Sequence, residues 1–268
     1  MSITVSALAL YPVKGAAGTA VEQVEFDRFG PIGDRRWLVV DEAGHFVTQR
    51  EHPRLAVVAP TMVPGGLRLT VPDGGVVEVP TPAADAATRP VVIWRDTVLA
   101  ADAGDAAAAL LSAHLGAAVR LVGCTPAYQR QVDLSFARPG DQVTFADGFP
   151  ALLIGEASLA ELNHRGAMDL PMTRFRPNIV LRGTSPFEED GWRQVRIGTA
   201  LFDTPKPCAR CAVPTVDQAT GTVTGKEPLK TLATFRRGPN GAVLFGMNAI
   251  LREGTSIAVG DEVVGVTQ

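Results

Sequence analysis

Short runs of alternating apolar and polar residues, separated by glycine and proline, constrain this chain more than any other feature. ITVSALALYPV (3–13) alternates as a half-buried strand does. RRWLVVDEAGHFVTQRE (35–51) predicts a hairpin around Asp41–Gly44, and LRLTVPDGGVVEVP (67–80) predicts another around Asp73–Gly75. The first hundred residues therefore predict an antiparallel meander or barrel.

Two stretches predict helices, AGDAAAALLSAHLG (103–116) and GEASLAELNHRG (155–166), each with an acidic residue in its first turn and a glycine at its end. Strands return after residue 120, and VGDEVVGV (259–266) predicts a turn and a closing strand. We therefore expect a mainly β fold with a few helices, of the α+β class, with a domain boundary near residue 120.

Composition narrows the possible partners and compartment. The 25 Lys and Arg against 28 Asp and Glu give a net charge of −3, which does not favour nucleic-acid binding. No apolar run approaches the roughly 18 residues of a membrane span, and the N-terminus lacks a secretory pattern. The chain has only three cysteines, and an odd number cannot all pair, so a disulfide framework is not expected. We expect no membrane partner and a cytoplasmic location.

Cys208 and Cys211 form a CxxC pair with Arg210 between them. A structural zinc site needs four ligands, and neither Cys124 nor the histidines show suitable spacing. A dithiol couple needs CxxC at the start of a helix, whereas AVPTVD follows here. The pair is therefore read as two buried small residues or, because nearby cations stabilise a thiolate, as a ligand for a soft metal.

Cationic side chains stand where predicted strands end. Lys14 follows a strand in YPVKGAAG (11–18), where it either holds a phosphate beside free backbone N–H groups or is simply solvated. Arg35 and Arg36 alternate across a strand, so only one of them can face a given pocket. Otherwise they are a surface pair.

The stretch TRFRPNIVLRG (173–183) carries two more arginines and a polar amide. If its backbone is extended, Arg174 and Arg176 share one face, with Asn178 at the strand start, and they bind an anion or form a solvated rim. GKEPLKTLATFRR (225–237) is read as an amphipathic loop and edge strand. No hydrolase, zincin, dinucleotide or EF-hand motif occurs, and no carboxylate pair stands out.

Taken together, seven stretches resemble the MOSC family, and most closely its amidoxime-reducing group of mitochondrial proteins and their bacterial relatives. They are YPVKG (11–15), GDRRWLVVDEAGHFVTQREHPRLA (33–56), GEASLAELN (155–163), TRFRPNIVL (173–181), CARCAVPTVDQATG (208–221), EPLKTL (227–232) and LFGMNA (244–249). The resemblance implies an N-terminal β-barrel-like domain over residues 1–120 and a MOSC β-barrel over residues 121–268.

The resemblance implies an oxidoreductase that uses the molybdenum cofactor to reduce N-hydroxylated substrates, such as amidoximes and N-hydroxylated bases. Because no cysteine cluster follows Cys211, electrons are expected from a separate ferredoxin- or cytochrome b5-like protein. The resemblance also implies pyridoxal phosphate binding. The alternatives are a cofactor carrier or sulfur-transfer module without turnover, and a structural barrel without a cofactor.

The resemblance also implies roles for individual residues. Cys211 matches the molybdenum ligand, and so the catalytic position. Lys14 and Arg35 match contacts to the cofactor phosphate. The residues implied to line the pterin are Arg176, Asn178 and Arg210. Two positions depart from the mitochondrial pattern: Gly15 replaces a small hydroxyl residue, which removes one phosphate contact, and Asn248 replaces an aromatic residue, which makes the substrate mouth more polar.

Overall fold

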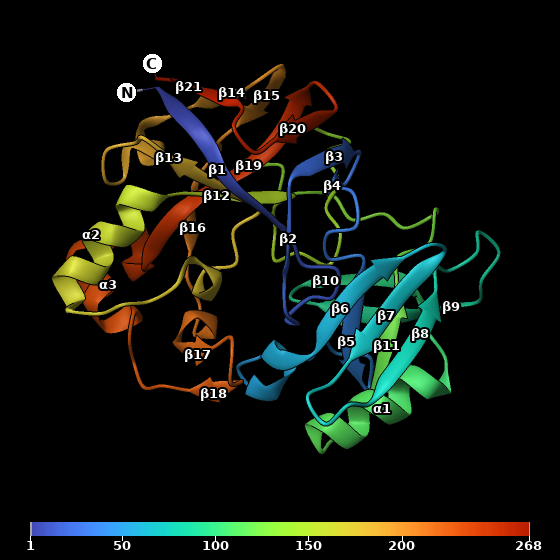
Figure 1. Cartoon of the computed structure of the whole chain (residues 1–268). Coiled ribbons are helices and arrows are strands. Elements are labelled where there is room, and N and C mark those ends of the chain that lie inside the picture. The colour runs from blue at the N-terminus through green and yellow to red at the C-terminus, as the bar shows by residue number, and fades with distance from the viewer. Residues whose placement is uncertain (1, 268) are drawn as a thin grey trace.

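A closed β-barrel is the largest unit of the computed structural model, which describes residues 2–267 (Figure 1). Within that range seven strands follow the order β12–β13–β1–β21–β14–β15–β19, and β19 pairs back onto β12. They are β1 (Ile3–Leu10), β12 (Ala151–Gly155), β13 (Ile179–Arg182), β14 (Gln194–Ile197), β15 (Ala200–Asp203), β19 (Leu244–Glu253) and β21 (Glu262–Val266). β2 (Thr19–Val21) and β16 (Pro207–Ala209) extend this sheet.

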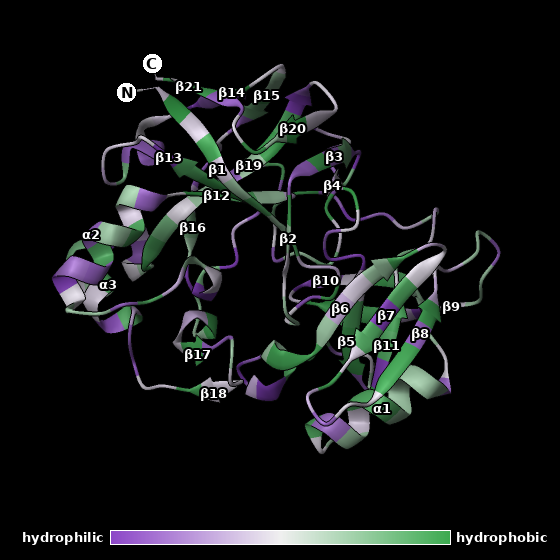
Figure 2. Cartoon of the chain, viewed as in Figure 1, coloured by the Kyte–Doolittle hydropathy of each residue, from purple (hydrophilic) through white to green (hydrophobic). Residues whose placement is uncertain are grey.

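The first strand of the chain belongs to this barrel. β1 lies between β13 and β21, so both ends of the chain meet on one side of the molecule (Figure 1). Apolar side chains from the barrel strands, among them Leu153, Phe202 and Val263, fill the interior. Figure 2 shows hydrophobic residues concentrated along the strands, as expected where one face of each strand is buried.

Two smaller sheets form a second core in the N-terminal half. One has the order β5–β11–β10–β9 and the other β6–β7–β8. These strands are β5 (Trp37–Asp41), β6 (Ala59–Val63), β7 (Gly66–Thr70), β8 (Val76–Pro80), β9 (Thr88–Ile93), β10 (Asp96–Asp102) and β11 (Val119–Gly123). The predicted hairpin at 67–80 is confirmed as β7–β8. The one predicted at 35–51 is confirmed at its turn, after which Val40 pairs antiparallel with Phe46 and Val47 N–H donates to the Val39 carbonyl at 2.8 Å, but its second arm makes isolated bridges and no full strand.

Both predicted helices are confirmed, as α1 (Asp105–Leu115) and α2 (Glu156–Gly166). A third helix, α3 (Leu229–Phe235), occupies the segment predicted to be a loop and edge strand, so that prediction was wrong. The buried Leu232 joins the apolar cluster under α2, and this packing supports the helix. With 39% strand and 18% helix, the mainly β class is confirmed.

The remaining elements are short. The strands are β3 (Gln23–Asp27), β4 (Gly30–Pro31), β17 (Val216–Asp217), β18 (Thr222–Val223) and β20 (Ser256–Ala258), and the 3-10 helices are η1 (Pro53–Val57), η2 (Met172–Arg174), η3 (Glu188–Gly191), η4 (Val213–Thr215) and η5 (Pro239–Gly241). Among residues 2–267, every helix is too short or too polar to cross a membrane.

Candidate functional site

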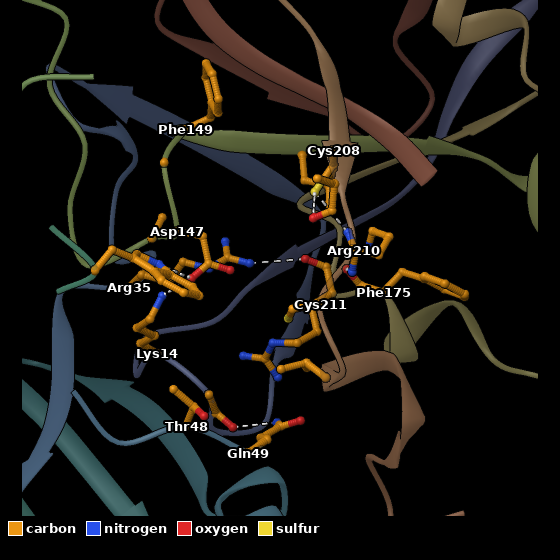
Figure 3. A pocket seen from close by; sticks show the side chains of 18 of the residues that line it. Lys14, Arg35, Thr48, Gln49, Asp147, Phe149, Phe175, Cys208, Arg210 and Cys211 are labelled. Carbon is orange, nitrogen blue, oxygen red and sulfur yellow. Dashed lines mark hydrogen bonds and ion pairs between the residues drawn. The ribbon is translucent and has the colours of Figure 1, made fainter. Parts of the chain in front are cut away.

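One pocket, where the N-terminal sheets meet the barrel, contains the eight residues that the family resemblance places at the site (Figure 3). It is partly open to solvent and is lined by both polar and apolar side chains, as small-molecule and cofactor sites are. The predicted residues in its lining are Lys14, Gly15, Arg35, Arg176, Asn178, Arg210, Cys211 and Asn248. Their individual roles remain predictions.

The pocket is strongly cationic. Among the described residues its lining holds five basic side chains and one carboxylate: Lys14, Arg35, Arg50, Arg176 and Arg210 against Asp147. The chain as a whole carries a net charge of −3, so this positive charge is local. A cleft of one sign concentrates ligands of the opposite sign. The lining therefore favours an anionic ligand.

Lys14 and Asp147 form an ion pair on one side of the pocket (Figure 3). Burial lowers the pKa of Lys14, and the Asp147 carboxylate opposes that effect. Burial acts to raise the pKa of Asp147, but the charge of Lys14 holds it well below its usual range. Trp94 Nε1 donates to Asp147 Oδ1 at 3.2 Å, and buried Arg130 fixes the loop by donating to the Ala146 carbonyl at 2.6 Å.

Arg35 is held by a buried polar network. Its guanidinium is ion-paired with Asp34, and Nη1 donates to Asn178 Oδ1 at 3.0 Å. Asn178 Nδ2 in turn donates to Asp34 Oδ1 at 3.0 Å and to the Ala9 carbonyl at 3.2 Å. Both ends of the Asn178 amide are thus engaged with the protein. Asn178 lines the pocket, and its bonds orient Arg35.

Only one arginine of the adjacent pair faces the pocket, as expected, but the reason differs from strand alternation. Arg35 precedes β5 and has a φ of +48°, in the left-handed region. Arg36 turns away and donates to Asp27 Oδ1 at 2.7 Å. A local reversal of the backbone, rather than the two-residue repeat of a strand, separates the two side chains.

Arg176 is a buried cation without a carboxylate partner within residues 2–267. Its guanidinium lies 4.3 Å from the Tyr11 ring centroid, and Nη1 donates to Gln218 Oε1 at 3.2 Å. Nη2 is buried with no hydrogen-bond partner. Burial lowers the Arg176 pKa to about 10. An anion in the pocket would satisfy both the free donor and the charge.

The backbone at 173–176 is not extended, so the condition for Arg174 and Arg176 to share one face is not met. Residues 172–174 form η2, and Arg176 has a φ of +57°. Arg174 consequently leaves the pocket and donates to Asp217 Oδ2 at 2.8 Å. The two arginines are separated by this turn, which leaves Arg174 paired and Arg176 unpaired.

The two cysteines of the CxxC pair have different surroundings. Cys211 lies opposite Lys14 in the pocket lining, while Cys208 packs against the apolar cluster around Phe175 (Figure 3). Arg210 Nη1 donates to Cys208 Sγ at 3.2 Å, and Nη2 donates to the Phe175 carbonyl at 2.7 Å. All three cysteines of the chain are free. Both cysteines therefore line the pocket. Cys208 accepts from Arg210, whereas the Cys211 thiol makes no hydrogen bond within residues 2–267.

The two departures from the mitochondrial pattern also lie in the lining. Gly15 has a φ of +81°, and a Cβ there would stand 2.7 Å from Leu55 Cδ2, so the position requires glycine. Asn248 on β19 donates through Nδ2 to the Lys206 carbonyl at 3.2 Å. A polar wall at this position is thus built into the barrel strand.

Sequence reasoning missed several residues of the site. They are Phe46, Gln49, Asp147, Trp94, Phe149 and, just outside the lining, Gln218. Asp147 follows a strand-like stretch without a partner in sequence, and Gln49 and Gln218 are single amides 169 positions apart. Trp94 sits in the β9–β10 turn with a φ of +57°, half exposed. The sequence signal that could have identified one of these residues was Trp94, an aromatic residue in a tight turn.

The donor set decides what kind of metal group this pocket can accept. No group of three or more His, Cys, Asp or Glu side chains suited to a metal occurs among residues 2–267. The pocket itself offers two soft ligands, the thiols of Cys208 and Cys211, among its cations. The orphaned Arg176 Nη2 adds an unmet demand for an acceptor. These features fit an anionic cofactor that already contains its metal, rather than a bare metal ion bound by protein ligands alone.

A mainly β protein with a barrel and a cationic, thiol-bearing pocket at its edge is the class that fold and site define. The MOSC N-terminal beta barrel domain matches residues 2–118, and the MOSC domain matches residues 140–264. The chain belongs to the MOSC family, as the resemblance predicted.

Curated relatives match over nearly the whole chain. It is 34% identical over 277 residues to mitochondrial amidoxime-reducing component 1 of Homo sapiens, covering 97% of this chain and 82% of the relative. It is 35% identical over 279 residues to the Mus musculus component 1, covering 97% and 81%. For mitochondrial amidoxime reducing component 2 of Bos taurus, identity is 34% over 281 residues, covering 99% and 84%.

Proposed function

We propose that this protein is a molybdenum-cofactor-dependent reductase of N-hydroxylated compounds, such as amidoximes and N-hydroxylated bases. The relatives' names support the reaction class. The observation that carries the proposal is the position of Cys211, a free thiol in the same pocket as Arg176, whose buried Nη2 has no hydrogen-bond partner. A thiolate holds a soft metal, and the surrounding cations hold the anionic part of the cofactor.

Each pocket residue has a proposed task. Cys211 holds the metal through its thiolate, and Lys14 and Arg35 bind the cofactor phosphate. Arg176 donates its free Nη2 to the pterin end, and Arg210 keeps the Cys208–Cys211 turn in place through its bond to the Phe175 carbonyl. When bound, the molybdenum cofactor supplies the two-electron chemistry that removes oxygen.

The reaction consumes two electrons and two protons. The N–O bond of the substrate breaks. One proton joins the hydroxyl oxygen, which leaves as water, and the other bonds to the nitrogen, which takes up the electron pair, so that N–OH becomes N–H. Both electrons come from a separate electron-transfer protein. Phe46, Trp94 and Phe149 give the pocket flat apolar surfaces that suit the planar amidoxime or base. Asn248 adds a polar wall that suits the heteroatoms of such substrates.

Two other readings of the pocket make different predictions. A carrier or sulfur-transfer module would bind the same group without turnover. Pyridoxal phosphate stays an expectation from the family resemblance. The lysine found in the described pocket lining, Lys14, is already ion-paired with Asp147. The cationic pocket supports the anionic molybdenum cofactor through five side chains, and no further lysine is needed for it.

Turnover with an artificial donor tests the proposal. Protein purified from a host that makes the cofactor is assayed for conversion of benzamidoxime to benzamidine with reduced methyl viologen. We expect turnover by the wild type and a loss of at least about a hundredfold in Cys211→Ala. Cys124→Ala, which removes a half-buried thiol outside the pocket, is the matched control. Cofactor-loaded wild type without turnover would instead favour the carrier reading.

A further inference from the structure

A second hollow on the surface adjoins the pocket through the chain itself. It lies between α3 and the segment that follows Cys211, and Ala212 lines it directly after Cys211 has lined the pocket. Consecutive Cα atoms are about 3.8 Å apart, so the two sites share a wall of backbone. We call this hollow the α3 groove. The pocket and the α3 groove are thus lined by consecutive residues of one segment.

The α3 groove carries positive charges that are not neutralised by ion pairs within residues 2–267. Lys226, Lys230 and Arg237 line it, and all three are exposed. None of them takes part in an ion pair within residues 2–267, and no carboxylate is in the lining. Glu227, the nearest acidic residue in sequence, faces the helix and accepts from the Thr231 backbone N–H at 3.0 Å. In a chain of net charge −3, three unpaired cations here form a local positive patch.

The floor of the α3 groove is apolar. Leu229 and Ala233, one turn apart on α3, are half-buried and lie between the cations. A small apolar centre with a charged rim is typical of a weak, short-lived protein contact, and electron-transfer encounters are among the smallest interfaces known. The groove therefore has the composition of a transient protein-docking surface.

We propose that the α3 groove is the docking site for an acidic electron-transfer protein. This inference rests on the proposed function, in which the electrons come from a separate electron-transfer protein. The cations would steer a negatively charged partner to the groove, and its position beside Cys211 would bring the partner's redox centre to the edge of the pocket.

Two triple variants with the same net charge test the proposal. One removes the groove cations, as Lys226→Gln, Lys230→Gln and Arg237→Gln. The control removes three exposed arginines on other elements, as Arg68→Gln, Arg182→Gln and Arg196→Gln, whose surface ion pairs contribute little to stability. Both lose three positive charges, so only the location of the change differs.

The probes are a reduced [2Fe–2S] ferredoxin, a flavodoxin and a soluble cytochrome b5 domain. Binding to each is measured by titration, and donor-driven substrate reduction by rapid mixing, at low and high ionic strength. For a donor that binds the wild type, we expect the groove variant to lose about tenfold or more in association rate at low ionic strength, with little salt dependence left. The control variant should keep the wild-type rate.

Three results would overturn the docking proposal. The groove variant and the control could respond alike, or none of the three donors could bind the wild type in a salt-dependent way. The wild type could instead bind a DNA oligonucleotide or an anionic vesicle through these cations while ignoring the donors. Reduced methyl viologen keeps the two proposals apart. It needs no docking, so failure of the wild type with viologen counts against the reductase, whereas donor binding still decides the groove.

Discussion

Gln49 and Gln218 face each other across the junction of the two halves, each side-chain amide donating to the oxygen of the other, at 3.0 and 2.9 Å. Gln49 Nε2 also donates to the Gly15 carbonyl at 2.6 Å, and Gln218 Oε1 accepts from Arg176 Nη1 at 3.2 Å. The amide pair thus connects the loop that carries Lys14 to Arg176. It fixes the spacing between the two cationic walls of the pocket.

Gln218→Ala should lower the free energy of unfolding by about 1–3 kcal/mol, because buried Gln49 and Arg176 both lose a partner. Chemical denaturation measures the change. Gln23→Ala, on the exposed edge of β3, is the control and should have almost no effect. Equal losses in the two variants would show that the amide pair contributes nothing to the junction.

Gly15→Ala should cost more than the same change at Gly65. Both glycines have positive φ, +81° and +77°, so both substitutions introduce backbone strain of about 1 kcal/mol. At Gly65 a Cβ meets nothing within 4 Å, whereas at Gly15 it meets Leu55 at 2.7 Å. We expect an additional loss of about 1–3 kcal/mol at Gly15. Indistinguishable melting temperatures would contradict the close packing of this loop.

Arg176→Met should stabilise the cofactor-free protein by about 1–3 kcal/mol, since it removes a buried charge that has no carboxylate partner in the described chain. Arg174→Met is the matched control two residues away. It breaks the pair with Asp217 and should destabilise by about 1–3 kcal/mol. Thermal melts of the two apo variants should shift in opposite directions. A loss of stability in both would contradict an unmet demand for an anion at Arg176.

Asp147→Asn should flatten the acid side of the stability curve. Lys14 holds the pKa of Asp147 below its usual range even though burial acts to raise it, so the unfolded chain binds a proton at higher pH than the folded one. The contribution is fully present above about pH 5 and is lost as the pH falls through the acid range. At neutral pH the variant should be less stable, because Lys14 stays buried without its partner.

Urea denaturation at several pH values checks this expectation. Asp85→Asn, in an exposed loop, provides the comparison for a lost surface carboxyl. Its curve should parallel that of the wild type, while the Asp147→Asn curve converges with the wild type at low pH. A constant gap between Asp147→Asn and wild type across the acid range would rule out this ion pair as the source of the pH dependence.

Local patterns in the sequence predicted the strands, α1 and α2, because the alternation of apolar residues and the glycine stops are read from neighbours alone. The helix α3 was missed. Its seven residues include Thr231, Thr234 and Phe235, which favour strands, and the Leu229–Leu232 spacing gives only one helical repeat. What favours the helix is the burial of Leu232 against residues from distant strands.

The candidate site divides in the same way. The eight residues named from the family resemblance all line one pocket, but the resemblance did not predict their backbone conformations. Arg35 and Arg176 adopt positive φ, which non-glycine residues do only when tertiary contacts hold them there. Asp147 and Gln49 have no local pattern, since their partners lie more than thirty positions away.

Molybdenum and pterin content tests the central claim most directly. Wild type, Cys211→Ala, Cys208→Ala and Cys124→Ala are purified from a host that makes the cofactor, and both components are quantified per chain. We predict near-stoichiometric metal and pterin in the wild type and in the Cys208 and Cys124 variants, with metal lost only from Cys211→Ala. Absence of molybdenum from the wild type, or full retention by Cys211→Ala, would contradict a cofactor site built on this thiol.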